Sequence, residues 1–267
     1  AQVTRVVLAE DCEIRTSYYG GGVVAYTQKS EIVSCENRAS VSFEGPAGYV
    51  GGIAGYVVST SSIDRCENLG IVTGTVQPSD NYASCLVYAG GIAGVNQESA
   101  IINSSNHAVV AVEALPEYDS CAGGIVGYNS GSSTFIANCY NVAGVQLSGS
   151  GFAGGILSYT DNADIRVANC YNIGTVSGVP GKSYPVVPIL SADSEDCYYL
   201  MNCVEGEGSY AGTALTVDYM KSTAFAARLN DWSKTNNSSE TGWQTLYWKI
   251  EDAENDGYPV FTDQDPG

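Results

Sequence analysis

The chain has 267 residues, 44% of them hydrophobic, so it is long enough and apolar enough to bury one or two cores. Its 29 acidic and 11 basic residues leave a net charge of −18. This balance excludes the cationic footprint that nucleic-acid binding needs, and it disfavours anionic membrane surfaces. No run of 18 or more apolar residues occurs, so we expect no membrane insertion.

The N-terminal stretch lacks the basic head and long apolar run of a signal peptide. We therefore expect the chain to be a segment of a longer polypeptide that carries further domains. A truncated first repeat is expected to end at residues 11–14.

Two short strings recur together along most of the chain. The first is a glycine doublet with an apolar tail, and its five copies begin at Gly21, Gly51, Gly90, Gly123 and Gly154. The second carries a cysteine or serine 14 to 16 residues after each doublet, followed by an asparagine. Both strings are rich in Gly, Val, Ile and Tyr and are bounded by turn-forming residues, which favours strands. Short strands at a fixed period predict a solenoid with one coil per repeat.

We therefore predict an all-β fold, a right-handed parallel β-helix of about six to seven coils. The solenoid is expected over residues 1–200, with a weaker sixth unit at 187–200, and a small mixed α/β capping segment over residues 201–267. Equivalent residues should stack in columns at the strand spacing, with asparagine amides hydrogen-bonded along the stack. The predicted columns are Val23, Ile53, Ile92, Ile125 and Ile156; Val41, Val72, Val110, Val145 and Val176; and Asn37, Asn68, Asn106, Asn141 and Asn172.

The nine cysteines are an odd number, so at least one is unpaired within the chain. Cys35, Cys66, Cys139 and Cys170 share one repeat position, with Ser104 in the third copy and Cys12 and Cys197 as extensions of the line. This alternation predicts a buried column of small side chains. If any disulfides form, the two pairs that we favour are Cys85–Cys121 and Cys197–Cys203.

Between the repeats, residues 75–88 and 113–121 are polar insertions that we expect to form loops at one edge of the rod. Past residue 200, residues 215–231 predict a helix with Thr216 as its N-cap. Residues 242–261 predict a strand, an Asp-Gly turn and a second strand. Because the last coil of a solenoid exposes an open core, we expect this segment to plug that end.

The repeats resemble those of bacterial surface proteins with the GLUG motif. The resemblance is carried by "GGIAG" at 51–55 and 90–94, "GGIVG" at 123–127, "CENLGIVTG" at 66–74 and "CYNIGTVSG" at 170–178, and the tail "RLND…W…NDGYPVF" is similar to the segment that closes such arrays. Residues 21–25 and 154–158 depart from the motif by losing its final glycine. The resemblance implies a secreted or wall-attached protein with adhesin-like or accessory roles, in some members beside protease domains that act on host immunoglobulin. It implies no catalytic residues.

One ligand-binding hypothesis follows from the repeat itself. Tyr26, Tyr56, Tyr128 and Tyr159 share a position, interrupted by Val95. Stacked outside the rod they would offer a platform for a glycan or a protein surface, whereas the alternative is that they only cover a corner of the coil. We expect no cofactor and no metal, because no C-x-x-C or other metal-ligand spacing occurs. The single histidine, His107, is expected at the surface and not as a base.

Three functions remain open. The first is a non-enzymatic extracellular module for adhesion, ligand presentation or spacing within a bacterial surface protein. The second is an accessory domain of a secreted protease or glycan-active enzyme. The third is a polysaccharide-active β-helix enzyme, although Asp64, Asp161 and Asp164 do not share one repeat position as a built cleft would require.

Overall fold

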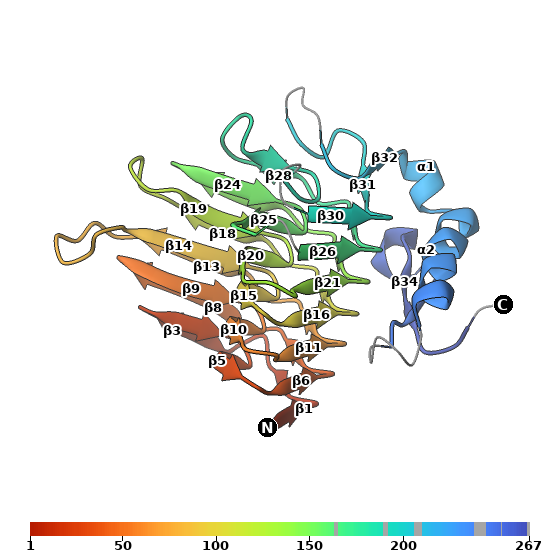
Figure 1. Ribbon diagram of the computed structural model, residues 1–267, viewed down its shortest axis with the longest axis horizontal. Coiled ribbons are helices and arrows are strands. Elements are labelled where there is room, and N and C mark those ends of the chain that lie inside the picture. The colour runs from red at the N-terminus through yellow and green to blue at the C-terminus, as the bar shows by residue number, and fades with distance from the viewer. Residues whose placement is uncertain (163–164, 189–191, 206–209, 238–243, 252, 266–267) are drawn as a thin grey trace.

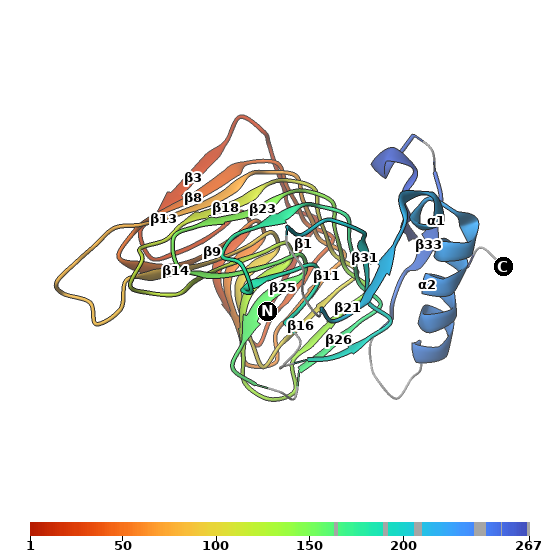
Figure 2. The ribbon, with the colours of Figure 1, turned by 90° about the horizontal axis from the view of Figure 1, so that it is seen from above.

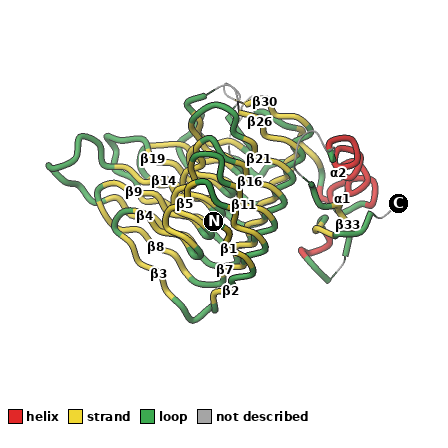
Figure 3. Tube along the Cα trace, turned by 60° about the horizontal axis from the view of Figure 1, so that its bottom comes forward, coloured by secondary structure: helices red, strands yellow, loops and turns green. Residues whose placement is uncertain are grey.

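The computed structural model describes residues 1–162, 165–188, 192–205, 210–237, 244–251 and 253–265. The chain winds into a parallel β-solenoid of about six turns, as predicted, and the helices of the described residues lie near the C-terminus (Figure 1; Figure 3). Each full coil contributes one strand to each of five sheets, which we number in the order the chain meets them. Every neighbouring pair within these sheets is parallel among the described strands.

The five sheets contain the following strands. The first sheet consists of β1 Gln2–Thr4, β6 Glu31–Val33, β11 Ser62–Asp64, β16 Ala100–Ile102, β21 Phe135–Ala137, β26 Ile165–Ala168 and β30 Ala192–Glu195. The second consists of β2 Val7–Leu8, β7 Glu36–Asn37, β12 Glu67–Asn68, β17 Ser105–Asn106, β22 Tyr140–Asn141, β27 Tyr171–Asn172, β31 Tyr198–Leu200 and β32 Thr213–Leu215. The third consists of β3 Glu13–Thr16, β8 Ser40–Gly45, β13 Val72–Val76, β18 Val110–Glu113, β23 Val145–Ser148 and β28 Val176–Ser177. The fourth consists of β4 Tyr19–Gly21, β9 Ala47–Gly51, β14 Leu86–Gly90, β19 Ser120–Gly123, β24 Gly151–Gly154 and β29 Ser183–Tyr184. The fifth consists of β5 Val24–Gln28, β10 Ala54–Val58, β15 Ala93–Gln97, β20 Val126–Ser130 and β25 Leu157–Thr160.

The predicted columns are confirmed. Backbone hydrogen bonds join Ile53 to its equivalents in neighbouring coils, and this column continues to Val186. The valine column runs in register through the third sheet, and the asparagine column runs through the second. Within the asparagine column each Nδ2 donates to the next Oδ1 at 2.7–2.8 Å, and all five side chains are fully buried.

Two apolar cores run along the rod. One lies between the first and fifth sheets and contains the Ile53 column together with the Ile63 column. The other lies between the third and fourth sheets and contains the Val72 column with Val50 and Val87. The third and fourth sheets project as a wing from the rest of the coil, as the view along the rod shows (Figure 2).

One corner of every coil has left-handed backbone geometry. It follows the first sheet, and φ lies between 48° and 56° at Arg5, Ser34, Arg65, Asn103, Asn138, Asn169 and Asp196. Asparagine and aspartate tolerate this conformation best among residues with a side chain. In three consecutive coils the corner is Asn103, Asn138 and Asn169, which form a second amide ladder at 2.7–2.8 Å.

The first coil differs from the prediction. Its Cys equivalent is Val6 and not Cys12, because β1 pairs with β6 so that Val3 lies beside Ile32. Cys12 lies farther along the chain and is exposed. At the other end Cys197 does extend the buried line, since Ala168 pairs with Glu195 two residues before it. The two insertions do form loops between the third and fourth sheets, at the tip of the wing (Figure 1). The loops are shorter than predicted and cover residues 77–85 and 114–119, because both ends of each insertion belong to strands.

The C-terminal segment lies along the side of the solenoid, not across its end (Figures 1 and 2). It comprises α1 Val217–Met220, α2 Thr223–Asn236, β33 Tyr247–Lys249, the 3₁₀ turn η1 Asn255–Gly257 and β34 Val260–Thr262. Phe225, Leu229 and Trp248 pack on the outer face of the second sheet, against the column Tyr140, Tyr171 and Tyr198. The expected end plug is therefore wrong, because the segment covers this aromatic column on the flank.

The helical region is also interrupted. Thr216 caps α1 by accepting a hydrogen bond from the backbone of Tyr219, as predicted. The helix then breaks at Lys221, and Ser222 caps α2 in the same way. A serine side chain that accepts a backbone N–H favours a new helix start at that point. The antiparallel pair β33 and β34 with a turn at Asp256 and Gly257 agrees with the prediction.

Candidate functional site

The predicted tyrosine column forms half of a larger aromatic surface. Tyr26, Tyr56, Tyr128 and Tyr159 lie in register in the fifth sheet, with Val95 between the second and third of them. A second aromatic column runs beside it in the fourth sheet. It contains Tyr19, Tyr49, Tyr88 and Phe152, with Cys121 in the fourth position. We call the eight aromatic residues of the two columns the aromatic strip.

Five rings of the strip form one continuous stack that changes sheet half-way. Along the fourth sheet the ring centroids of Tyr19, Tyr49 and Tyr88 lie 5.1 and 5.5 Å apart. The Tyr88 ring then stacks on Tyr128 of the fifth sheet at 4.6 Å, and Tyr128 stacks on Tyr159 at 5.9 Å. Successive ring planes differ by only 9–21°.

The interruption at Val95 is explained by this crossing. Val95 stands in the fifth sheet in the same coil as Tyr88, and Cys121 stands in the fourth sheet in the same coil as Tyr128. Each small side chain therefore faces a large ring across the corner between the two sheets. Both small residues are buried, at 3% and 1% exposure. The gap in the predicted column thus makes room for the stack and does not end it.

The corner itself requires close backbone packing. A Cβ on Gly94 of the fifth sheet would lie 2.6 Å from the backbone nitrogen of Val50 in the fourth. This explains the last glycine of the "GGIAG" string, because no side chain fits between the two sheets there. In the fifth copy the position is Ser158, whose hydroxyl donates to the Gly127 carbonyl oxygen.

The strip is accessible mainly at its edges. Tyr26 is 48% exposed, and the other ring-bearing residues of the strip are half-buried. Because stacked rings cover one another's faces, a ligand would meet ring edges and phenol oxygens. Burial raises the pKa of Tyr49, Tyr56 and Tyr88, so these phenols stay protonated at physiological pH. Within the strip, the Tyr56 hydroxyl donates to Gln97 Oε1 and the Tyr128 hydroxyl donates to Asp161 Oδ2. At one end Lys182 lies 4.7 Å from the Phe152 ring centre and pairs with Asp119.

A second candidate site is a cavity of about 420 Å³ between the second sheet and the C-terminal segment. We call it the junction cavity. The solenoid contributes Arg65, Glu67, Ser105, His107 and Tyr140 to its wall, among others, and the C-terminal segment contributes Leu246, Glu254, Asn255, Val260 and Phe261.

His107 lines this cavity, so the expectation of a surface histidine is wrong. Burial lowers the pKa of His107 to about 4, which leaves the imidazole neutral at pH 7. Its Nε2 lies 3.2 Å from Glu67 Oε1 and 3.2 Å from Ser105 Oγ. A serine–histidine–acid triad needs the acid and the serine on different ring nitrogens. Both partners here share Nε2, so this arrangement is not a triad.

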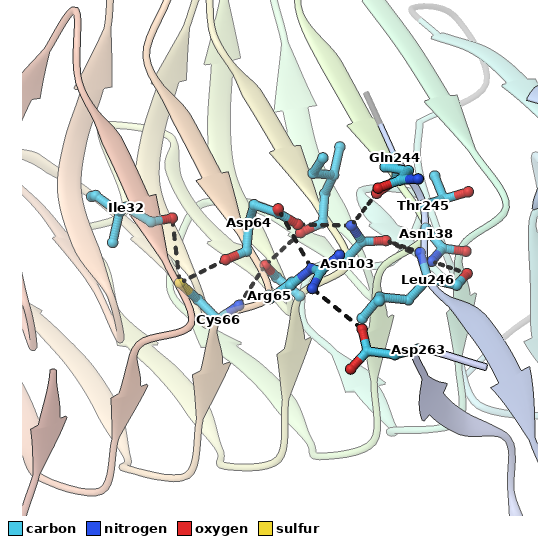
Figure 4. A network of polar contacts seen from close by, with 12 residues as sticks. Ile32, Asp64, Arg65, Cys66, Asn103, Asn138, Gln244, Thr245, Leu246 and Asp263 are labelled. Carbon is cyan, nitrogen blue, oxygen red and sulfur yellow. Dashed lines mark hydrogen bonds and ion pairs between the residues drawn. The ribbon is translucent and has the colours of Figure 1, made fainter. Parts of the chain in front are cut away.

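A network of polar contacts joins the solenoid to the C-terminal segment beside the cavity, and Arg65 and Asn103 belong to both the network and the cavity lining (Figure 4). Arg65 pairs with Asp64 at 3.7 Å and with Asp263 of the C-terminal segment at 3.2 Å. Asn103 Nδ2 donates to Asp64 at 2.7 Å, and Asn103 Oδ1 accepts from the Leu246 backbone at 2.8 Å. Asn138 Oδ1 accepts from the Trp248 indole at 2.8 Å. The asparagines of the second amide ladder therefore anchor the C-terminal segment to the solenoid through hydrogen bonds.

All nine cysteines are free thiols, so neither favoured disulfide is formed. Eight of them are buried, and Cys35, Cys66, Cys139, Cys170 and Cys197 share the core between the first and fifth sheets. The Cys66 amide donates to Ser104 Oγ at 3.2 Å, which shows why serine replaces cysteine in this column. Among the described residues no group of three or more His, Cys, Asp and Glu side chains is placed to hold a metal ion. None of the described helices is long and apolar enough to cross a bilayer.

The fourth-sheet half of the strip was missed from the sequence. Tyr19, Tyr49 and Tyr88 do recur two residues before the first three glycine doublets. That signal was present, but only the structure shows that this position and the one five residues after the doublet meet at one corner.

No family model and no curated protein matches the chain. A solved structure from Bacteroides ovatus, named "putative immunoglobulin A1 protease", is similar to the whole fold. It has a TM-score of 0.62 and 22% identity, and the match covers 99% of this chain and 76% of that one. A second solved structure, named "IgA1 Protease", gives a TM-score of 0.44 and 15% identity over 75% of this chain and 17% of that one. At these identities the likeness shows the fold alone.

Proposed function

We propose that the chain is a non-enzymatic, extracellular bacterial repeat module that binds a partner through its aromatic strip. The observation that carries the proposal is the continuous stack from Tyr19 to Tyr159, which presents ring edges and phenol oxygens along one line of a rigid rod. Aromatic side chains with a polar end are enriched at recognition surfaces because they bury area at little entropic cost. The module would present its ligand or its neighbouring domains away from the cell surface.

The edge-on rings favour one type of contact. Sugar rings pack on exposed aromatic faces, whereas edges and hydroxyls suit a partner with hydrogen-bond acceptors, such as a protein backbone. Each coil repeats this contact at the strand spacing of about 4.8 Å. An elongated partner with such acceptors would therefore meet several equivalent contacts and gain affinity from their number.

Binding to immobilised protein and glycan arrays tests the proposal. We expect the double variant Tyr128→Ala and Tyr159→Ala to bind the array partner at least about tenfold more weakly. The corresponding Tyr→Phe variant separates packing from hydrogen bonding, because it keeps the rings and removes the hydroxyls. Tyr82→Ala is the matched control, since Tyr82 is 43% exposed in the loop of the wing. An array without any strip-dependent partner, or equal losses in the control, would contradict the proposal.

The likeness to the Bacteroides ovatus structure favours a second function, an accessory domain within a secreted protease. In that role the rod would hold the substrate for a catalytic domain elsewhere in the polypeptide. Incubation of the chain with immunoglobulin A1 tests this idea by surface plasmon resonance and by gel. Binding without cleavage supports the accessory role, and the absence of any binding argues against it. Cleavage by this chain alone would instead make it an enzyme.

A further inference from the structure

One edge of the C-terminal hairpin is closed by side chains. β33 lies between α2 and β34. Toward α2, the Asn230 side chain accepts from the Trp248 amide at 2.7 Å and donates to the Trp248 carbonyl at 2.8 Å. Asn237 makes the same pair of bonds with the backbone of Thr245, at 2.6 and 2.9 Å. Both backbone positions on this edge therefore have partners within the chain.

The opposite edge, along β34, leaves one pair of backbone groups free. In an antiparallel pair, the backbone groups of successive residues point alternately toward and away from the partner strand. Because the Trp248 backbone points to Asn230, the residue paired with it, Phe261, points away from β33. The Phe261 N–H and C=O form no hydrogen bond within the described part of the chain. An open strand edge of this kind is a template for an added strand.

The open edge faces one particular corner of the solenoid. β34 crosses successive coils and so runs along the rod, and its contacts follow in the order Pro259 with Tyr171, Phe261 with Tyr140 and Asp263 with Arg65. The hydrogen bonds of Leu246 to Asn103 and Asn138 place the start of β33 at the corner before the second sheet. The edge of β34 that points away from β33 is therefore turned toward the corner after the second sheet.

That corner carries a mostly apolar column beside the junction cavity. Its members directly follow the ladder asparagines, and they are Leu69, His107, Val142 and Ile173. His107 lines the cavity together with Val260 and Phe261 of β34. Val142 and Ile173 already pack against the aromatic cluster under the hairpin, whereas Leu69 is 38% exposed. The contact between the hairpin and the flank thus continues past β34 onto an exposed apolar side chain.

We propose that an extended peptide segment of a partner protein binds here as a third strand on the open edge of β34. Its backbone would bond the Phe261 N–H and C=O, and alternate side chains would enter the junction cavity and cover Leu69. Strand addition takes its affinity from the backbone and its specificity from pockets for alternate side chains. A peptide with an apolar residue at every second position therefore fits the site.

The added strand is short, which favours a peptide as the occupant. Pro259 bounds the open stretch on one side, because proline has no N–H to offer to an added strand. The ion pair of Asp263 with Arg65 bounds it on the other side. The site shares no residue with the aromatic strip, which lies on the fourth and fifth sheets. Its test is therefore independent of the proposed function.

The open edge contains one of five phenylalanines, which makes strand addition observable by NMR. Isotope labelling of the phenylalanine nitrogens gives one amide signal for each, and Phe261→Leu identifies the signal of Phe261. Titration with the peptide acetyl-Thr-Val-Thr-Val-Thr-amide should shift this signal in a saturable way and slow its hydrogen exchange. The same peptide, N-methylated at its central residues, cannot donate to the Phe261 carbonyl and should bind at least about tenfold more weakly.

A variant of the column tests the second half of the site. Leu69→Ser should weaken binding of the unmethylated peptide about tenfold, because it removes the apolar contact outside the cavity. Tyr82→Ala is the control, since Tyr82 is 43% exposed in the loop of the wing. The proposal is overturned if the peptide causes no saturable shift, if N-methylation does not weaken it, or if Leu69→Ser binds as well as the parent. A shift of the Phe261 signal on raising the protein concentration alone would also overturn it, because the edge would then pair with a second copy of the chain.

Discussion

Gly52 lies directly against the side-chain amide of Asn68. A Cβ at Gly52 would come within 2.2 Å of Asn68 Cγ and 2.2 Å of the Gly91 carbonyl oxygen in the next coil. The same contact joins Gly22 with Asn37, Gly91 with Asn106, Gly124 with Asn141 and Gly155 with Asn172. The glycine doublet and the asparagine of the second string are therefore in direct contact in each coil. The buried asparagine ladder fits because the glycine has no side chain at this point.

Substitution of this glycine should be strongly destabilising. We expect Gly52→Ala to lower the free energy of unfolding by about 3 kcal/mol, because the methyl group must displace either a buried amide or a backbone carbonyl. Gly144→Ala is the control, since its nearest contact for a Cβ is 3.5 Å away. Urea denaturation followed by far-UV circular dichroism measures both. Equal stability of the two variants would show that the ladder relaxes freely.

The C-terminal segment should detach before the solenoid unfolds when its hydrogen bonds to the second amide ladder are removed. Asn138→Leu removes the acceptor of the Trp248 indole and the donor to the Leu246 carbonyl, and each orphaned group costs about 1–3 kcal/mol. All three tryptophans lie beyond residue 230, so tryptophan fluorescence reports on this segment alone. We expect its urea transition to precede the circular dichroism transition in this variant.

The matched control for that experiment is Asn96→Leu. Asn96 is equally buried but belongs to the fifth sheet, where its Nδ2 donates to Asn129 Oδ1 at 3.2 Å. In this control the circular dichroism transition should shift and the fluorescence transition should not precede it. The interpretation fails if both variants uncouple the two signals to the same extent.

His107 should make the protein less stable in mild acid. Its folded-state pKa of about 4 lies below the ordinary value of 6.5, so the unfolded chain binds the proton first as the pH falls. The contribution is present in full above about pH 6.5 and is lost as the pH falls toward 4. Between pH 7.5 and pH 5 we expect a loss of about 2 kcal/mol from this group. The difference between the parent chain and His107→Gln, measured by urea denaturation at both pH values, isolates it from the carboxylates. A pH-independent difference would contradict this account.

A single thiol should react rapidly in the native protein. Cys12 is exposed, whereas the other eight cysteines are buried. Burial also raises the pKa of Cys170, which suppresses its thiolate. Ellman's reagent should therefore modify one thiol per chain quickly, and Cys12→Ser should abolish this phase. All nine thiols of the parent should react in denaturant. Several fast equivalents in the native state would mean that the cysteine column opens.

The repeat predicted the solenoid well because its period fixes the register. Once Asn68 is placed beside Asn37 and Asn106, every other column of the coil follows from counting along the chain. The first coil could not be placed in this way, because it has Val6 at the position where most later repeats have a cysteine. The crossing of the aromatic stack could not be predicted either, because sequence spacing within one repeat does not reveal which two sheets meet at a corner.

The sequence does signal where the C-terminal segment packs. The residue before the ladder asparagine is Glu36 and Glu67 in early repeats, but Tyr140 and Tyr171 in later ones, and Tyr198 follows in the last. An outward-facing position that changes from charged to aromatic indicates where something packs on the outside. The interactions of the segment with Asn103 and Asn138 could not be predicted, because these residues also suit the left-handed corner on purely local grounds.

Side-on docking separates the length of the rod from its closing segment. The segment forms hydrogen bonds with Asn103, Asn138 and Asn169, at three successive corners one coil apart. Its docking therefore depends on the spacing between these coils and not on the number of coils that precede them. A whole unit added or removed before residue 60 would leave these hydrogen bonds intact while lengthening or shortening the row of tyrosines. Reach and valency could thus vary by duplication of a single genetic unit, with no redesign of the remainder.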